Sequence, residues 1–368
     1  MAAQTLTSAE RPVVIAGNGV RVGQAWAALV ELAESLDAPV ATSASGKGVF
    51  DETHPLAAGV MGSFGSAGAN EVVGTADVVL AVGTKLGPHD TADAHADLLD
   101  PSRQTLIQID VEPLNAGWTF PVDHVLVGEA GFQMDQLREA CAAVGNRPRA
   151  TSGTARVAEA INRHAELDAP EFRSDDMPLA PQRIIAVLQE ALPENTMVSC
   201  DAGENRLFMM HWYRSKLPGG YLQPAAGGGM GYAVPAAMGA KLAFPDRPAL
   251  AVCGDGGFAM SLHALMTAIQ EDLPIAVVVF NNGALGWVLH GMGKRAVAAD
   301  FASFDHVAIA SSLGCDAVQV ASSADLRDAV QSVGELSRPL VIDVPTSLAT
   351  SFRDVTQDIA KQRLESGY

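Results

Sequence analysis

Residues 249–282 read ALAVCGDGGFAMSLHALMTAIQEDLPIAVVVFNN and carry the strongest structural signal in the chain. Two apolar runs, 249–253 and 274–280, are bounded by Pro and Gly and flank a helical pattern between about Phe258 and Glu271. This order predicts a βαβ unit. Such crossovers are right-handed and join parallel strands, so the loops that leave both strands emerge at the same carboxyl edge of the sheet.

Two polar side chains directly follow these predicted strands, Asp255 after the first and Asn282 after the second. The topology brings them together, and a carboxylate and an amide oxygen are hard ligands that suit a small divalent cation such as Mg²⁺. We predict a metal-diphosphate site in which a backbone carbonyl, placed at Ala284, is a further ligand. Three glycines are expected to let backbone N–H groups approach the phosphates: Gly254, Gly256 and Gly257. The alternative is that GDG and the Asn pair are ordinary turn signals.

The GDG segment, its spacer and the Asn pair closely resemble the thiamine diphosphate motif of the acetolactate synthase, pyruvate oxidase and 2-keto acid decarboxylase superfamily. The resemblance continues upstream in GGGMGYAVPAAMGAKLAFPDRP and downstream to PLVIDV at residues 339–344. In the first third of the chain, RPVVIAGNGV, ADVVLAVGTKL and TLIQIDVEP look like the central domain of those enzymes. The resemblance implies that thiamine diphosphate and Mg²⁺ are the cofactors.

Strand-like runs alternate with helical patterns in the first part of the chain, at residues 12–16, 38–42, 77–82 and 105–110. The fold class expected is α/β, with two doubly wound parallel-sheet domains. The predicted division is a central Rossmann-like domain at 1–144, a Pro-, Ser- and Gly-rich linker with one short helix at 145–178, and a thiamine diphosphate-binding domain at 179–368. The polar end, Ser351 to Tyr368, is interpreted as a helix lying on a partner.

Members of the superfamily carry a pyrimidine-binding domain ahead of the central domain, whereas only Met1 to Glu10 precede the first predicted strand here. That domain provides the Glu that activates the cofactor, and no residue of this chain matches it. The resemblance therefore implies a separate pyrimidine-domain subunit as partner. We expect a hetero-oligomer built on a homodimeric core.

The resemblance also assigns roles around the cofactor rings. The backbone at Gly228 is expected to face the aminopyrimidine, and the neighbouring Gly229 belongs to the same cofactor-binding turn. Met230 is expected to wedge between the two rings and hold the cofactor bent, which places its amino group against the carbon to be deprotonated. From the residues alone, the glycines also suit a flexible turn and Met230 also suits the core.

Residues Ala202, Gly203 and Asn205 occupy the place where acetolactate synthases put a Gly-Gln-His segment against the diphosphate. Glu204 departs from that pattern. Its carboxylate would repel phosphate unless it turns away, pairs with a cation or stays protonated.

Trp287 and His290 follow the Asn pair on a segment that, by resemblance, leads to the substrate pocket. His290 is the one tentative catalytic residue, as a proton shuttle; the alternative is a partly exposed histidine with no such role. Gly291 stands where plant-type acetolactate synthases carry a pocket Trp, which argues against assignment to that enzyme.

A Gly17-Asn18-Gly19 turn follows the first predicted strand and is a weak signal for a dinucleotide, because the next glycine, Gly23, comes one position late for GxGxxG. By resemblance, VGTKLGPHD lacks the arginine-bearing segment of the FAD-binding acetolactate synthases. FAD is therefore a possible but not an expected cofactor.

The composition fits an enzyme subunit that works in the cytoplasm. The net charge is -18 with no Lys/Arg run, which argues against nucleic acid and anionic membranes as partners. The N-terminus lacks the features of a signal peptide, and no apolar stretch approaches the ~20 residues of a membrane span. The four cysteines show no CxxC spacing and are expected to be buried thiols.

The resemblance implies decarboxylation of a 2-keto acid. We expect the large subunit of a split thiamine diphosphate-dependent decarboxylase and carboligase, acetolactate synthase-like, which transfers the remaining fragment to a second carbonyl. Alternatives are a simple 2-keto acid decarboxylase, a lyase that releases an aldehyde, and a non-catalytic cofactor-binding or regulatory subunit. A truncated product without function is a further alternative.

Overall fold

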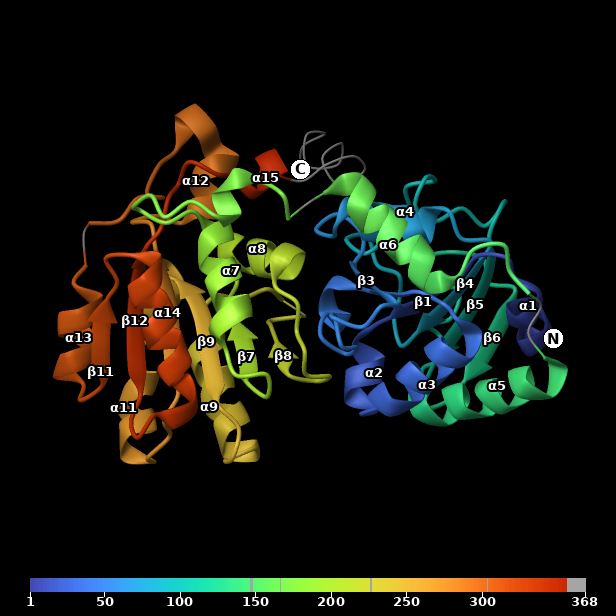
Figure 1. Cartoon of the computed structure of the whole chain (residues 1–368), viewed down its shortest axis with the longest axis horizontal. Coiled ribbons are helices and arrows are strands. Elements are labelled where there is room, and N and C mark those ends of the chain that lie inside the picture. Colours follow the sequence, from blue (N-terminus) through green and yellow to red (C-terminus); the bar gives the residue numbers. More distant parts are fainter. Residues whose placement is uncertain (146–147, 166, 226, 303, 356–368) are drawn as a thin grey trace. The chain divides into compact units, whose positions relative to one another are not determined.

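The structure is a computed structural model of the whole chain, and it describes residues 1–145, 148–165, 167–225, 227–302 and 304–355 (Figure 1). The described residues divide into two compact units, one up to residue 165 and the other from Leu167 to Val355. The division falls inside the segment 145–178 that the sequence indicates as a linker. Residues 356–368, the larger part of the expected C-terminal helix, lie outside the described residues.

The first unit contains a six-stranded sheet in which every pairing is parallel and the order is β3-β2-β1-β4-β5-β6. The chain reverses its direction of winding between β1 and β4, as in doubly wound folds. The strands are β1 (Pro12–Ala16), β2 (Val40–Thr42), β3 (Ala57–Val60), β4 (Val78–Val82), β5 (Thr105–Asp110) and β6 (His124–Val127).

Helices cover both faces of this sheet (Figure 1). Val14 and Ala16 of β1 pack into a core with α1, α3 and α5, while Val13 and Ile15 pack into a second core with α4 and α6. This alternation follows from the two-residue period of a strand. The helices are α1 (Ala2–Ser8), α2 (Asn18–Val22), α3 (Trp26–Leu36), α4 (Ala67–Gly74), α5 (Ala130–Val144) and α6 (Gly153–His164), with a 3₁₀ turn η1 (Ala44–Gly46).

Helix α6 lies in the segment expected as a linker, yet it is part of the first unit. Its buried Arg156 donates to the carbonyl oxygens of Pro12 at 2.7 Å and Val72 at 3.1 Å. Desolvation by burial, followed by repulsion from Arg11, lowers the pKa of Arg156 to about 10. The helix is therefore attached to β1 and α4 through a buried guanidinium.

The glycine turn after β1 is in direct contact with the loop after β4. The N–H of Gly19 donates to the carbonyl of Gly83 at 2.9 Å, and a Cβ on Gly17 would lie only 2.3 Å from that same oxygen. The close approach of these two loops accounts for the glycines without a bound dinucleotide. The expectation about FAD stays a prediction.

The second unit has another six-stranded sheet with parallel pairings only, in the order β11-β12-β10-β9-β7-β8. The strands are β7 (Met197–Cys200), β8 (Tyr221–Leu222), β9 (Ala249–Gly254), β10 (Ala276–Asn281), β11 (Asp316–Gln319) and β12 (Leu340–Pro345). The prediction of an α/β fold with two doubly wound parallel sheets is confirmed.

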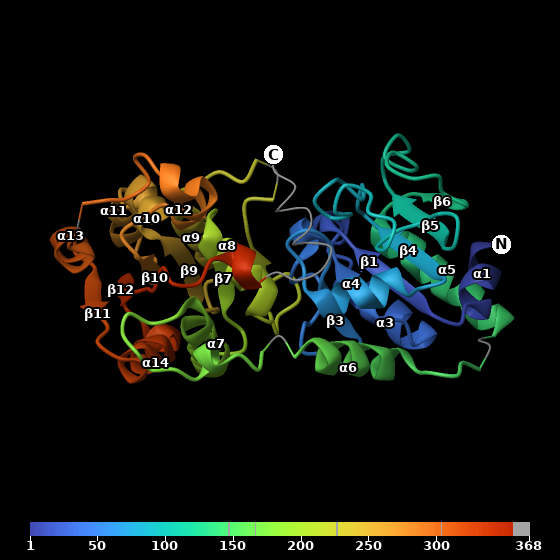
Figure 2. The ribbon, with the colours of Figure 1, turned by 90° about the horizontal axis from the view of Figure 1, so that it is seen from above.

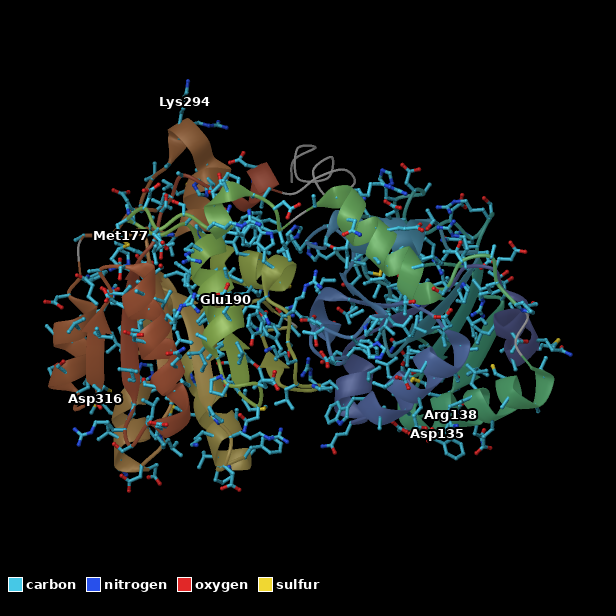
Figure 3. All side chains as sticks on the ribbon, in the orientation of Figure 1. Asp135, Arg138, Met177, Glu190, Lys294 and Asp316 are labelled. Atoms are coloured by element: carbon cyan, nitrogen blue, oxygen red, sulfur yellow. The ribbon has the colours of Figure 1, made fainter. Side chains whose placement is uncertain are left out.

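Helices again lie on both sides of the sheet (Figure 2). The α helices are α7 (Pro181–Ala191), α8 (Glu204–Trp212), α9 (Ala233–Ala243), α10 (Asp255–Ser261), α11 (Ala264–Gln270), α12 (Gly286–Met292), α13 (His306–Ser312), α14 (Ser323–Gln331) and α15 (Phe352–Val355). The 3₁₀ turns are η2 (Pro170–Phe172), η3 (Gly293–Arg295) and η4 (Ser332–Glu335). Arg327 of α14 pairs with Glu190 of α7, which is labelled in Figure 3, at 2.6 Å.

The crossover between β9 and β10 contains two short helices rather than the single helix expected from Phe258 to Glu271. The hydroxyl of Ser261 donates to the carbonyl of Gly257 at 2.8 Å, a bond that tends to bend helices. The N–H of Leu265 then bonds the carbonyl of Leu262 in a tighter i to i+3 turn. The first helix also begins three residues earlier, at Asp255.

All four cysteines are buried and free, as expected from their spacing. Burial raises the pKa of Cys200 to about 12, so this thiol is held protonated at neutral pH. Across the described ranges, no helix combines the length and the apolar character that crossing a bilayer requires.

Candidate functional site

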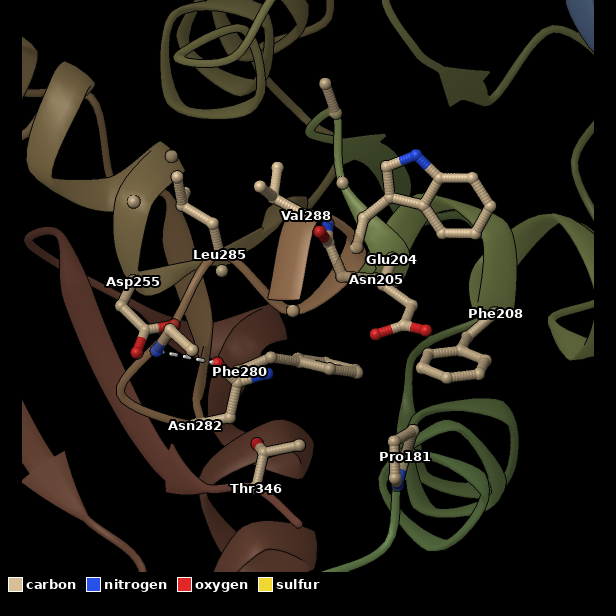
Figure 4. A pocket seen from close by; sticks show the side chains of 18 of the residues that line it. Pro181, Glu204, Asn205, Phe208, Asp255, Phe280, Asn282, Leu285, Val288 and Thr346 are labelled. Atoms are coloured by element: carbon tan, nitrogen blue, oxygen red, sulfur yellow. Dashed lines mark hydrogen bonds between the residues drawn. The ribbon is translucent and has the colours of Figure 1, made fainter. Parts of the chain in front are cut away.

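Loops from four neighbouring strands of the second sheet meet in one pocket of about 850 Å³, including its open mouth. The strands β7, β9, β10 and β12 are parallel, so their carboxyl ends deliver these loops to one edge. Figure 4 shows Asp255 and Asn282 close together on one wall and Glu204, Asn205 and Phe208 on another.

Most of the residues singled out in the sequence line this pocket. They are Ala202, Gly203, Asn205, Gly228, Met230, Gly254, Asp255, Gly256, Gly257, Asn282 and Ala284. Gly229 belongs to the same loop but is not among the residues that line the pocket. His290 lies behind Glu204, a lining residue, and bonds to it.

Asp255 is buried at the start of α10, and its two carboxylate oxygens differ. Oδ2 accepts the backbone N–H of Gly283 at 2.6 Å, whereas Oδ1 has no hydrogen-bond partner. Burial raises the pKa of Asp255, although hydrogen bonds from its surroundings oppose that shift. A buried carboxylate oxygen without a partner is costly unless something binds it, and a cation is the natural candidate.

Asn282 presents its side chain beside Asp255, and its Oδ1 accepts the N–H of Ala284 at 3.1 Å (Figure 4). The pocket therefore offers a carboxylate oxygen and an amide oxygen, hard donors of the kind that Mg²⁺ favours. The described residues hold no cluster of three His, Cys, Asp or Glu side chains that could bind a metal. The donors present at Asp255 and Asn282 fit a Mg²⁺ that completes its coordination with phosphate oxygens and water.

Asp201 organises the opposite side of the site, and the sequence interpretation missed it. It is fully buried at the end of β7 and accepts backbone N–H groups of Ala202 at 2.8 Å, Gly231 at 2.9 Å and Ala233 at 3.0 Å. Burial raises the pKa of Asp201, and these N–H groups oppose the shift. The carboxylate thereby joins the loop after β7 to the loop that carries Met230. An acid directly after an apolar strand was the available signal.

Glu204 does not stand as an isolated charge in the pocket. Nδ1 of His290 lies 2.9 Å from its Oε2, and the N–H of Phe352 donates to its Oε1 at 2.7 Å. The other nitrogen of His290, Nε2, lies 3.1 Å from the carbonyl oxygen of Leu348. The catalytic role of His290 stays a prediction.

The segment after β12 was also missed, although it lines the pocket with Thr346, Ser347 and Thr350. The strand itself was expected from PLVIDV, and polar residues follow it directly, as they follow β9 and β10. The position of β12 beside β10 was the missing information, because it places this third loop next to Asn282.

Comparisons with known proteins agree with this site. Residues 1–137 match the family model described as thiamine pyrophosphate enzyme, central domain, and residues 201–344 match thiamine pyrophosphate enzyme, C-terminal TPP binding domain. A crystal structure of a candidate thiamin diphosphate-dependent enzyme from Mycobacterium smegmatis superposes with a TM-score of 0.73 at 26% identity, covering 94% of this chain and 63% of that one.

Two curated relatives are similar over most of the chain. One from Methanocaldococcus jannaschii, named "Probable acetolactate synthase large subunit", is 32% identical over 93% of this chain and 58% of its own length. A sulfoacetaldehyde acetyltransferase from Alcaligenes xylosoxydans xylosoxydans is 32% identical over 90% of this chain and 59% of its own length. The chain thus spans less than two thirds of the length of these relatives. With both family models matched and the pocket formed at the expected strand ends, the chain belongs to the thiamine pyrophosphate enzyme family.

Proposed function

We propose that this chain holds the diphosphate end of thiamine diphosphate, through Mg²⁺, in an enzyme that decarboxylates a 2-keto acid and transfers the remaining fragment. The observation that carries the proposal is the position of buried Asp255 beside Asn282 at the ends of adjacent strands. Oδ1 of Asp255 has no hydrogen-bond partner there. When bound, the cofactor supplies an acceptor for the electron pair left as CO2 departs.

The residues of this chain would bind and orient the cofactor. Asp255, Asn282 and the carbonyl of Ala284 would hold Mg²⁺, while the loop with Gly228 and Met230 would contact the rings. Asp201 fixes that loop through two backbone N–H bonds, to Gly231 and Ala233. A fixed loop lowers the entropy cost of placing the two ends of the cofactor in one geometry.

The activating Glu is proposed to come from outside residues 1–368, on a pyrimidine-binding domain. We propose that this domain belongs to a separate subunit, within a hetero-oligomer that has a homodimeric core. Both relatives are longer than the region that matches this chain, which leaves length in them for a domain of this kind.

Transfer is favoured over simple release of an aldehyde by the names of the relatives, which are a synthase and an acetyltransferase. Gly291 lies beside Arg353, whose guanidinium is 5.2 Å from the ring centroid of Trp287. Trp287 lines the pocket, and we propose that the neighbouring cation attracts an anionic substrate such as a 2-keto acid toward it.

The test measures CO2 release from pyruvate and bulkier 2-keto acids, using the chain alone and together with a pyrimidine-binding domain. We expect turnover that requires Mg²⁺ and thiamine diphosphate and that Asp255→Asn abolishes. Asp246→Asn, an exposed acid before the same strand, is the matched control and should retain turnover. Binding of both cofactors without turnover of any 2-keto acid would favour a non-catalytic binding subunit, and activity of the chain alone would contradict the requirement for a partner.

A further inference from the structure

Glu204 is the residue at which this chain departs from the Gly-Gln-His segment, and its carboxylate is the centre of a buried hydrogen-bond network. Oε1 accepts the backbone N–H of Phe352 at 2.7 Å and the hydroxyl of Ser351 at 3.3 Å. Nδ1 of His290 lies 3.0 Å from Oε1 and 2.9 Å from Oε2. The side chain of Glu204 is only 6% exposed, so water does not satisfy it.

Nε2 of His290 faces the carbonyl oxygen of Leu348 at 3.1 Å. The imidazole thereby bridges the carboxylate of Glu204 and the backbone at Leu348.

The network holds the segment from Ser347 to Phe352, which we call the strap. Ser347 and Thr350 line the cofactor pocket, while Leu348, Ser351 and Phe352 bond to His290 or Glu204. The ring of Phe352 is fully buried, with its centroid 5.9 Å from that of Phe208. The strap is thus held at one end by the packing of Phe352 and along its length by hydrogen bonds to Glu204 and His290.

Helix α12 begins against the same carboxylate. A Cβ on Gly286, its first residue, would lie 2.9 Å from Oε2 of Glu204 and 3.3 Å from Nδ2 of Asn282. Only glycine allows this approach without displacing Glu204. Three walls of the pocket, from α8, α12 and the strap, therefore meet at one carboxylate.

We propose that Glu204 and His290 are positioning residues that clasp the strap along the pocket and so fix the wall beside the cofactor diphosphate. The identity of the ligand rests on the proposed function, whereas the clasp itself rests on the contacts among α8, α12 and the strap.

Other charged or titratable groups lie around the pair on each neighbouring element. On the strap side, Oδ2 of Asp354 accepts the N–H of Ser351 at 3.3 Å, and Arg353 covers Trp287 of α12. On α8, the ring of His211 packs edge-on against Phe352 at 5.7 Å. Asp255 lines the same pocket.

The proposal predicts opposite behaviour for two substitutions. Glu204→Gln keeps an oxygen for Phe352 and Ser351 and has an N–H group that can bond to His290, so the strap stays attached. Glu204→Ala removes the acceptor altogether.

The test is hydrogen exchange of the Phe352 amide at neutral pH. We expect wild type and Glu204→Gln to be protected, and Glu204→Ala to exchange about tenfold faster or more. Glu194→Ala, at an exposed glutamate paired with Lys216, is the control and should behave as the wild type. If Glu204→Ala does not fold, His290→Ala takes its place and should exchange the Phe352 amide faster than the wild type.

Full protection of Phe352 in a folded Glu204→Ala, or in His290→Ala, would overturn the clasp. A parallel titration with Mg²⁺ and thiamine diphosphate, followed by tryptophan fluorescence, separates this proposal from the proposed function. Loss of Phe352 protection without any fluorescence response in the wild type would support the clasp and count against the cofactor. Weaker cofactor binding in Glu204→Ala, restored in Glu204→Gln, would support both.

Discussion

The backbone N–H of Gly283 donates to Oδ2 of Asp255 at 2.6 Å, although the two residues are 28 positions apart in the chain. The bond joins the loop after β10 to the loop after β9 and leaves Oδ1 of the carboxylate without a partner. A buried acid held in this way is poorly suited to stabilising the fold and well suited to binding a cation.

Replacing Asp255 by Asn should therefore separate stability from binding. An amide of the same shape removes a buried charge, so the unfolding free energy without metal should be unchanged or higher by about 1 kcal/mol. Binding of Mg²⁺ with thiamine diphosphate should be lost. Urea unfolding and calorimetric titration measure the two effects, and a folded protein that binds both ligands normally would show that Asp255 is not the ligand.

The pH dependence of stability should carry the signature of the same carboxylate. Burial raises the pKa of Asp255 in the folded state, so the folded protein holds the proton more tightly than the unfolded chain. Its contribution to stability is present below the usual carboxyl pKa and is lost as pH rises through the raised value. Without Mg²⁺, wild-type stability should fall relative to Asp255→Asn over this range. Parallel curves for the two proteins would contradict the assignment.

Asp201→Asn should destabilise the second unit by about 2 kcal/mol, because an amide cannot accept from the N–H groups on both sides of the carboxylate. The N–H groups of Gly231 and Ala233 should then exchange faster with solvent. Thermal unfolding and hydrogen exchange report the two changes. Asp246→Asn again serves as the exposed control, and equal stability of the two variants would show that Asp201 has no organising role.

The buried pair of His306 and Asp343 offers a prediction about stability away from the pocket. Nδ1 of His306 lies 3.0 Å from Oδ1 of Asp343, and Gln319 donates to Oδ2 at 2.7 Å. Burial raises the pKa of Asp343, but these hydrogen bonds outweigh it and the net shift is downward. His306→Leu should cost about 3 kcal/mol, because it leaves a buried carboxylate without its main partner.

A double-mutant cycle checks that cost. His306→Leu with Asp343→Leu should be less destabilising than the sum of the two single changes, since the double variant leaves no unpaired charge. Additive effects in urea unfolding would mean that the two side chains do not interact.

The sequence predicted the strand ends of the site because apolar runs followed by Asp255 or Asn282 obey local rules. Strand β9 follows from its apolar run, and the convergence of the two loops follows from the right-handed crossover. The break between α10 and α11 was not predicted, because it depends on a side-chain bond from Ser261 to the backbone of Gly257.

Contacts over long sequence separations were beyond local patterns. Glu204 and Phe352 are 148 positions apart, and only the order of the strands brings the loop after β7 near the segment after β12. The helix α6 was assigned to a linker because its surroundings are polar, whereas its buried Arg156 bonds carbonyls of β1 and α4. Composition does not report such contacts.

The most direct test of the account is calorimetric titration of thiamine diphosphate into wild type, Asp255→Asn and Asn282→Ala, with and without Mg²⁺. We expect the wild type to bind thiamine diphosphate only when Mg²⁺ is present. Both variants should stay folded and should not bind it. Binding that is indifferent to Mg²⁺, or that survives in both variants, would contradict the claim that Asp255 and Asn282 hold the metal-diphosphate group.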